Sequence, residues 1–161
     1  MAEVTVLGIG NTLMRDDGVG VRLMEAVRDS RRWPAGVEFI DGGAGGLNLL
    51  SAVESARKLV VFDSADMCLP PGEHRVIGDE QIASEPAEHR LSLHDISFLE
   101  TLRLARLTSP GPEKVAILAV QPGAVSSGGE LGAEIQAAFS GLVQAGISLV
   151  DGLLDRAPGV D

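Results

Sequence analysis

The acidic side chains of this chain recur at one kind of place, directly after a short apolar segment. Three such segments occur in the first half of the sequence, at residues 4–7, 37–40 and 59–62. Asp41 and Asp63 directly follow the second and third of them, and Asp17 lies in the turn beyond the first. If the segments are neighbouring parallel strands, these carboxylates lie at the same edge of one sheet. Open α/β folds bind their ligands at that carboxyl edge.

Each of these acidic residues also has an ordinary structural role to set against a chemical one. Asp16 and Asp17 could cap a helix, where a carboxylate is favoured by about 0.3–1 kcal/mol, but one cap needs only one acid. Asp41 precedes two glycines and could simply form a turn. Asp63 follows four apolar residues of a central strand. Its carboxylate therefore needs a metal ion or hydrogen-bond donors to replace the lost hydration.

Of the three histidines, one occupies a position suited to metal binding. His74 and His89 fall in a polar stretch, where exposed side chains need no special function. His94 lies between Ser92 and Asp95 in a segment that resembles a helix capping box. In the first turn of such a helix the dipole disfavours imidazolium, so His94 keeps a neutral nitrogen available as a ligand.

Asp17, Asp63 and His94 together form a candidate metal site. Two carboxylates and one imidazole from three separate segments leave coordination positions open on a divalent ion. Open positions are typical of catalytic or substrate-docking sites and not of closed structural ones. Imidazole suits nickel or zinc better than magnesium.

Length and composition describe one acidic domain. The 161 residues fit a single domain, 1–161, with a surface insertion expected at about 66–90 and a frayed tail at about 155–161. The formal charge of -10 excludes ordinary nucleic-acid binding, which needs clustered Lys and Arg. The single cysteine, Cys68, excludes an internal disulfide and suits a reducing compartment. With no leader pattern and no apolar run near the roughly 20 residues of a membrane span, we expect a cytoplasmic protein without membrane insertion.

Alternating strand and helix patterns predict the elements that position these residues. The spacing of apolar residues predicts helices from Val19 to about residue 30, around Leu49 to Ala56, from Phe98 to Ala105 and from Leu131 to Leu149. Further strands are expected at residues 73–77 and 115–120. Strands that alternate with helices indicate an α/β fold built from βαβ units.

A set of short motifs resembles the [NiFe]-hydrogenase maturation endopeptidases over roughly residues 4–150. The most specific block runs from Gly8 to Val21 with the pattern GxGNxxxxDDGxGV. The other motifs are Asp41-Gly42-Gly43, Asp63 at a strand end, His94, and Val120-Gln121-Pro122. The resemblance implies a three-layer α/β/α sandwich with a mainly parallel, twisted sheet of about five strands.

The same resemblance implies an activity and a partner. Such an enzyme removes a short C-terminal extension from the hydrogenase large-subunit precursor, and does so only after nickel has been placed in that precursor. By matching motifs, Asp17, Asp63 and His94 would contact this nickel. Many relatives carry Glu at the position of Asp17.

A protease of this kind is expected to use water as its nucleophile. No Ser or Cys lies in a recognisable nucleophile setting. A metal could polarise the scissile carbonyl or lower the pKa of a bound water, and Asp41 could take a proton or orient that water. Asp17, Asp41 and Asp63 are therefore the candidate catalytic carboxylates. Nickel is expected to arrive with the precursor, held by its cysteines, and another divalent cation could substitute for it.

Two other functions are open at this point. A dinucleotide-binding domain would share the Gly-x-Gly turn and the acid at Asp41. However, Leu13 stands at the third glycine position, and Asp16 and Asp17 would repel the pyrophosphate. A non-catalytic chaperone for the nickel-bearing precursor would keep the same acidic positions. An aspartic protease is disfavoured, because one Asp-Gly-Gly lacks the second matching loop.

Overall fold

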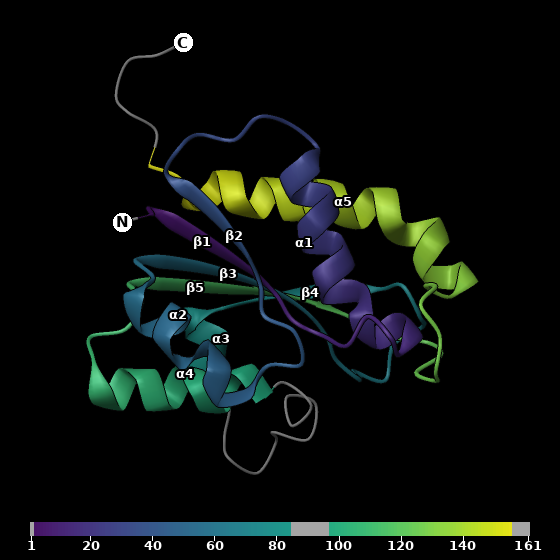
Figure 1. Cartoon of the computed structure of the whole chain (residues 1–161), viewed down its shortest axis with the longest axis horizontal. Coiled ribbons are helices and arrows are strands. Elements are labelled where there is room, and N and C mark those ends of the chain that lie inside the picture. Colours follow the sequence, from purple (N-terminus) through teal and green to yellow (C-terminus); the bar gives the residue numbers. More distant parts are fainter. Residues whose placement is uncertain (1, 85–96, 156–161) are drawn as a thin grey trace.

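The computed structural model describes residues 2–84 and 97–155 and arranges them in three layers, with a five-stranded sheet between two layers of helices (Figure 1). The strand order is β2-β1-β3-β5-β4. The strands are β1 (Val4–Gly8), β2 (Val37–Asp41), β3 (Lys58–Ser64), β4 (His74–Gly78) and β5 (Lys114–Val120). Four of them are parallel, and β4 pairs antiparallel with β5 at one edge. The expected α/β/α sandwich is confirmed.

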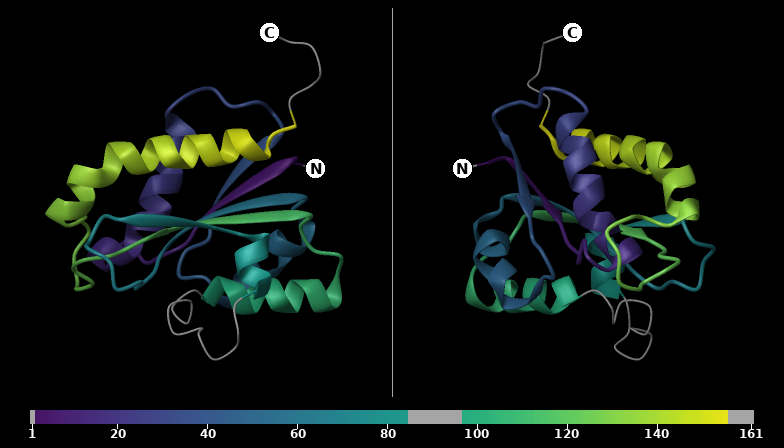
Figure 2. Two further views of the ribbon diagram at one scale, coloured as in Figure 1. Left: turned by 180° about the vertical axis from the view of Figure 1, so that it is seen from behind. Right: turned by 45° about the vertical axis from the view of Figure 1, so that its right-hand side comes forward.

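The helices divide between the two faces of the sheet. They are η1 (Arg15–Gly18), α1 (Val19–Asp29), η2 (Gly46–Leu49), α2 (Leu50–Ser55), α3 (Asp79–Ser84), α4 (Ser97–Thr108) and α5 (Ala133–Leu153). In both views of Figure 2, α1 and α5 cover one face, and α2 and α4 cover the other. The helices predicted from apolar spacing are thus all present.

The central strand β3 shows why the strands of this sheet appear in the sequence as continuous apolar segments. Leu59 and Val61 pack into the core on the α2 and α4 side, while Val60 and Phe62 pack into the core on the α1 and α5 side. A strand buried on both faces has no polar side to alternate with. Successive side chains point to opposite faces, so Asp63 extends the Leu59 and Val61 row at the strand's carboxyl end.

The strand order creates a crevice at the carboxyl edge. The chain leaves β1 toward β2 on one side, and later returns as β3 on the other side of β1. The carboxyl ends of β1 and β3 therefore flank a switch point, which is where open α/β folds form ligand crevices.

The segment expected to be a surface insertion, at about 66–90, contains the short strand predicted at 73–77. This strand is β4, and it joins the sheet by pairing with β5 from His74 opposite Val120 to Gly78 opposite Ala116. The short helix α3 follows directly. The first part of this segment therefore supplies an edge of the sheet, while residues 85–90 lie outside the described residues.

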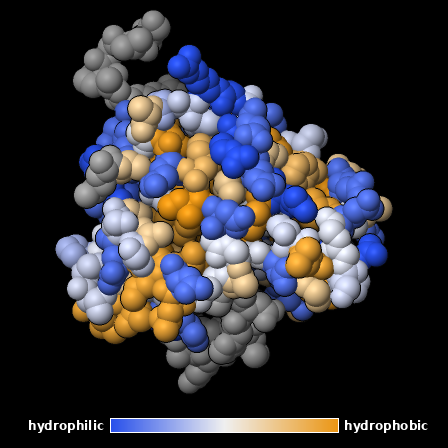
Figure 3. Space-filling view, in the orientation of Figure 1, coloured by the Kyte–Doolittle hydropathy of each residue, from blue (hydrophilic) through white to orange (hydrophobic). Residues whose placement is uncertain are grey.

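The long helix α5 bears on the expectation of no membrane insertion. Within 2–84 and 97–155, it is the one helix long and apolar enough to cross a membrane, so the statement that no segment reaches that length was too strict. Ile135, Leu142 and Val150 of α5 are buried against the sheet and α1, and 22% of its most apolar window is buried in all. Figure 3 shows hydrophilic residues scattered among hydrophobic ones over α1 and α5.

The amino edge of the sheet is fixed by a buried lysine. The Nζ of Lys58 lies 2.7 Å from Asp155, 3.3 Å from Glu3 and 2.8 Å from the Leu153 carbonyl oxygen. The hydrogen bond between Lys58 and Asp155 raises the pKa of Lys58 and lowers the pKa of Asp155. The stabilisation from Asp155 is lost only as pH falls through its lowered pKa, and that from Lys58 only as pH rises through its raised one. This edge therefore keeps its charges near neutral pH.

Candidate functional site

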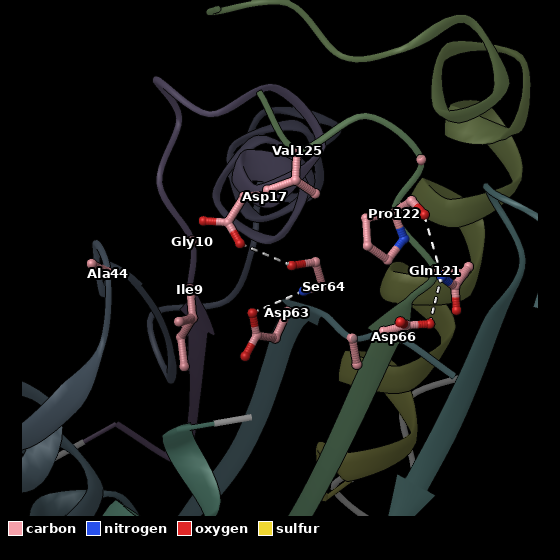
Figure 4. A pocket seen from close by; sticks show the side chains of 12 residues that line it. Ile9, Gly10, Asp17, Ala44, Asp63, Ser64, Asp66, Gln121, Pro122 and Val125 are labelled. Atoms are coloured by element: carbon pink, nitrogen blue, oxygen red, sulfur yellow. Dashed lines mark hydrogen bonds between the residues drawn. The ribbon is translucent and has the colours of Figure 1, made fainter. Parts of the chain in front are cut away.

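A cavity of about 500 Å³ opens at the carboxyl edge of the sheet (Figure 4). It is lined by Ile9, Gly10, Asp17, Ala44, Asp63, Ser64, Ala65, Asp66, Gln121, Pro122, Gly123 and Val125. These residues come from the end of β3, from η1 and from the loops after β1, β2, β3 and β5, as the switch point requires. The lining has three carboxylates and, within the described parts of the chain, no Lys, Arg or His.

Asp63 sits at the floor of this cavity, at the end of β3. Its residue is only 5% exposed, and its Oδ1 accepts a 2.8 Å hydrogen bond from the Ser64 N–H. The flanking strands β1 and β5 are themselves buried, so the carboxylate reaches solvent only through the cavity. The sequence prediction that Asp63 closes a central buried strand is confirmed.

Asp17 reaches the same cavity from η1. Its Oδ2 accepts a 3.0 Å hydrogen bond from the Asn11 N–H, and its Oδ1 accepts a 3.4 Å hydrogen bond from the Ser64 hydroxyl. Ser64 thus donates to both carboxylates, through its N–H to Asp63 and through its hydroxyl to Asp17. The two acids predicted to converge do so, and one residue orients them both.

Glycines allow the first turn to bring Asp17 this close. Gly10 has φ +145°, and a Cβ there would lie 2.0 Å from the Asp17 carbonyl oxygen. The turn therefore folds back on η1 only with glycine at this position. The Gly-x-Gly pattern here serves the approach of two backbone segments.

The same turn argues against a dinucleotide site. In a dinucleotide-binding domain, amides at the Gly-rich turn and helix N-terminus bind the pyrophosphate. Here the Asn11 N–H donates to Asp17, and the Asp17 carboxylate stands at that turn. A phosphate would meet a negative charge where it needs a donor.

Asp16 has a different role from its neighbour. It is 0% exposed, and its two oxygens accept hydrogen bonds from Gly123 N–H at 2.8 Å and Gly132 N–H at 2.6 Å. The N-cap of α1 is Gly18, which makes no side-chain cap bond. The capping interpretation of Asp16 and Asp17 was wrong, because both carboxylates bind backbone outside α1. Asp16 ties the loop after β5 to the first turn.

Asp16→Asn is expected to destabilise the protein by about 1–3 kcal/mol. Asparagine has one acceptor oxygen and one NH₂ group, so one of the two backbone N–H donors must face another donor. Urea or thermal unfolding followed by circular dichroism measures the loss. Asp29→Asn, at the exposed end of α1, is the matched control. Equal stability of Asp16→Asn and wild type would contradict the bracing role.

Asp41 lies beside the cavity and not in its lining. It is exposed, and its Oδ1 accepts a 2.8 Å hydrogen bond from the Gly43 N–H. The Gly43 carbonyl oxygen in turn accepts a 2.7 Å bond from the Gly10 N–H. Asp41 therefore shapes the loop after β2 that meets the loop after β1. Its action on a water or proton stays a prediction.

His94 lies outside the described residues. Within 2–84 and 97–155, no group of three His, Cys, Asp or Glu side chains is placed to hold a metal ion. The candidate metal site is therefore represented by its two carboxylates, Asp17 and Asp63, while the role of His94 stays a prediction.

Sequence reasoning missed three lining residues as functional candidates: Ser64, Asp66 and Gln121. Gln121 is 6% exposed and Asp66 is exposed. Both follow buried strands, β5 and β3, at the carboxyl edge. A polar residue directly after a buried parallel strand is the signal that could have found them.

Comparison with known proteins identifies the family. The sequence matches the hydrogenase maturation protease family model HycI over residues 21–149. The chain belongs to the hydrogenase maturation protease family. Among its relatives, hydrogenase expression/formation protein HoxM of Cupriavidus necator is 37% identical over 148 residues, which are 91% of this chain and 73% of that protein. Hydrogenase 2 maturation protease of Escherichia coli is 31% identical over 123 residues, 74% of this chain and 73% of that protein.

The family fold extends over nearly all of the chain. The hydrogenase-maturating endopeptidase HybD of Escherichia coli superposes with a TM-score of 0.79 at 25% identity, covering 94% of this chain and 93% of that one. An endopeptidase from Escherichia coli solved in solution gives 0.80 at 27% identity, with the same coverages. Some family members are longer than this chain. The chain spans 65% of the length of hydrogenase expression/formation protein HupM of Azotobacter chroococcum. The expected family membership is confirmed.

Proposed function

We propose that this member of the hydrogenase maturation protease family is an endopeptidase that removes the C-terminal extension of a [NiFe]-hydrogenase large-subunit precursor. The observation that carries the proposal is the meeting of Asp17 and Asp63 in one cavity at the switch point, with Ser64 donating to both. Family membership supports hydrolysis of a hydrogenase precursor. We place the proposed cleavage in this cavity.

Nickel enters this proposal as part of the substrate. Asp17 and Asp63 supply oxygen donors, and His94 would add the nitrogen donor that suits nickel. The helix α4 begins at the same edge, where the Thr101 hydroxyl donates a 3.2 Å hydrogen bond to the Gly46 carbonyl oxygen. His94 stands three positions before Ser97, the first residue of α4, and lies outside the described residues. Its approach to Asp17 and Asp63 belongs to this proposal.

The proposed reaction uses water and the carboxylates of this cavity. Nickel held by the precursor would polarise the scissile carbonyl or dock the segment that carries it. Asp63, buried and held by the Ser64 N–H, is placed to accept a proton or orient the attacking water. Asp17, held by hydrogen bonds from Asn11 and Ser64, lines the same cavity from η1. Processing in the cytoplasm belongs to this proposal and is supported by the lone exposed thiol of Cys68.

The test is cleavage of the large-subunit precursor in its nickel-loaded and nickel-free forms. Mass spectrometry of the precursor with and without the protein should show loss of the C-terminal extension from the loaded form alone. His94→Ala should abolish that loss if His94 contacts the nickel. Cleavage of both forms at equal rates would remove nickel from the proposal. An unchanged C-terminal mass of loaded precursor would favour a non-catalytic chaperone.

A further inference from the structure

The wall of the cavity opposite Asp17 carries a third carboxylate, Asp66. Figure 4 shows Asp66 and Gln121 across the cavity from Asp17, with Asp63 and Ser64 between them. Neither the proposed nickel contacts nor the proposed water activation uses Asp66. The role of Asp66 in the cavity lining is therefore a separate question.

Asp66 is held at one oxygen and open at the other. Its Oδ1 accepts hydrogen bonds from Gln121 Nε2–H at 3.2 Å and from Cys68 N–H at 3.1 Å. Within the described parts of the chain, no donor is placed on Oδ2. Two donors on one oxygen fix the plane of the carboxylate and leave the second oxygen to accept from a ligand.

Gln121 is well suited to orient Asp66, because its own amide is fixed. Its Oε1 accepts hydrogen bonds from Met67 N–H at 2.6 Å and from Leu69 N–H at 3.3 Å. Since both partners are backbone donors, the oxygen must face them and the NH₂ group must face Asp66. The buried Gln121 thus links the end of β5 to the loop after β3 and turns a donor toward the cavity wall.

The charge of the cavity indicates what Asp66 binds. Asp17, Asp63 and Asp66 line one space in which the described residues include no cationic side chain. Such a space attracts positive charge and hydrogen-bond donors. Two of these carboxylates are assigned above to the nickel and the water, so the third is available to the peptide itself.

We propose that Asp66 is a substrate-binding residue whose free oxygen accepts a hydrogen bond from an N–H or cationic group of the precursor segment, and that Gln121 is the positioning residue that orients it. This inference rests on the proposed function and deepens it. It assigns recognition of the peptide to the wall opposite Asp17, separate from recognition of the nickel.

Asp66→Asn tests the binding role with little change of shape. The Asn oxygen can still accept from Gln121 and Cys68, while an NH₂ group replaces the open oxygen. In cleavage of nickel-loaded precursor we expect KM to rise about 10–100-fold with kcat nearly unchanged, because the lost bond is made equally in the ground and transition states. The unfolding temperature should stay near that of wild type, as for the control Asp29→Asn.

Gln121→Glu tests the positioning role independently. Glu keeps an acceptor for Met67 and Leu69 but replaces the donor, 3.2 Å from Asp66, with a second carboxylate oxygen. We expect the same rise in KM. The matched control is Gln81→Glu, which adds the same charge and keeps its acceptor for the Gly78 N–H, outside the cavity. Gln81→Glu should cleave like wild type.

Specific outcomes would overturn the inference. Wild-type KM in Asp66→Asn and Gln121→Glu would remove both residues from substrate binding while leaving the proposed function intact. A loss of kcat alone, or a lowered unfolding temperature with unchanged KM, would make their role catalytic or structural. If wild type leaves the loaded precursor uncut, the proposed function itself fails, and the inference fails with it.

Discussion

Asp63→Asn is expected to lower kcat/KM for precursor cleavage by about 10²–10⁴-fold without disturbing the fold. The Asn oxygen can still accept the Ser64 N–H, so the end of β3 keeps its geometry. The substitution also removes the negative charge of a residue that is 5% exposed. A charge in so little water acts strongly on a bound metal or a reacting water, because few solvent dipoles screen it.

The measurement pairs activity with stability. Cleavage of nickel-loaded precursor gives kcat/KM, and thermal unfolding shows whether the domain is intact. A buried carboxylate is costly to the folded state, so we expect Asp63→Asn to unfold at or near the wild-type temperature. Asp29→Asn, an exposed carboxylate outside the cavity, provides the control. Processing by Asp63→Asn at the wild-type rate would end the case for Asp63 as a functional carboxylate.

Gly20→Ala is expected to cost about 3 kcal/mol of stability, the upper end of the usual cost of overpacking, and to abolish cleavage together with it. A Cβ on Gly20 would lie 2.3 Å from the carbonyl oxygens of both Ile9 and Phe62. These are backbone atoms at the ends of β1 and β3, so neither can move away as a flexible side chain would. The start of α1 must instead shift from the sheet, and Asp17, three residues earlier, shifts with it.

A second glycine in the same protein provides the control. Gly141 lies within α5, and a Cβ there would meet nothing within 4 Å. Gly141→Ala should therefore leave the fold intact and raise stability by about 0.5–1 kcal/mol, because alanine is the better helix former. Urea unfolding of both variants measures the contrast. A Gly20→Ala protein as stable as wild type would show that α1 does not depend on this close contact.

Much of the fold follows from local patterns in the sequence. The five strands and the main helices appear where the apolar spacing predicted them, because alternation and helical spacing are properties of a few neighbouring residues. The carboxyl-edge location of Asp17 and Asp63 followed from the same reasoning, since strand ends and turns are local features. The strand predicted at 73–77 is present as β4, but its place at the edge of the sheet was not foreseen, because its exposed His74, Arg75 and Val76 carry little burial pattern.

The separate roles of adjacent Asp16 and Asp17 were decided only by tertiary structure. From the sequence either acid could have been a helix cap, and Asp17 was also a candidate ligand; in the structure Asp16 binds backbone 107 and 116 positions away, and Asp17 faces the cavity. Likewise, the Gln121 and Asp66 pair is separated by 55 positions. The sequence by itself determined which elements form and that acids gather at one edge. Which oxygen meets which donor depends on long-range packing, for which no local pattern carries information.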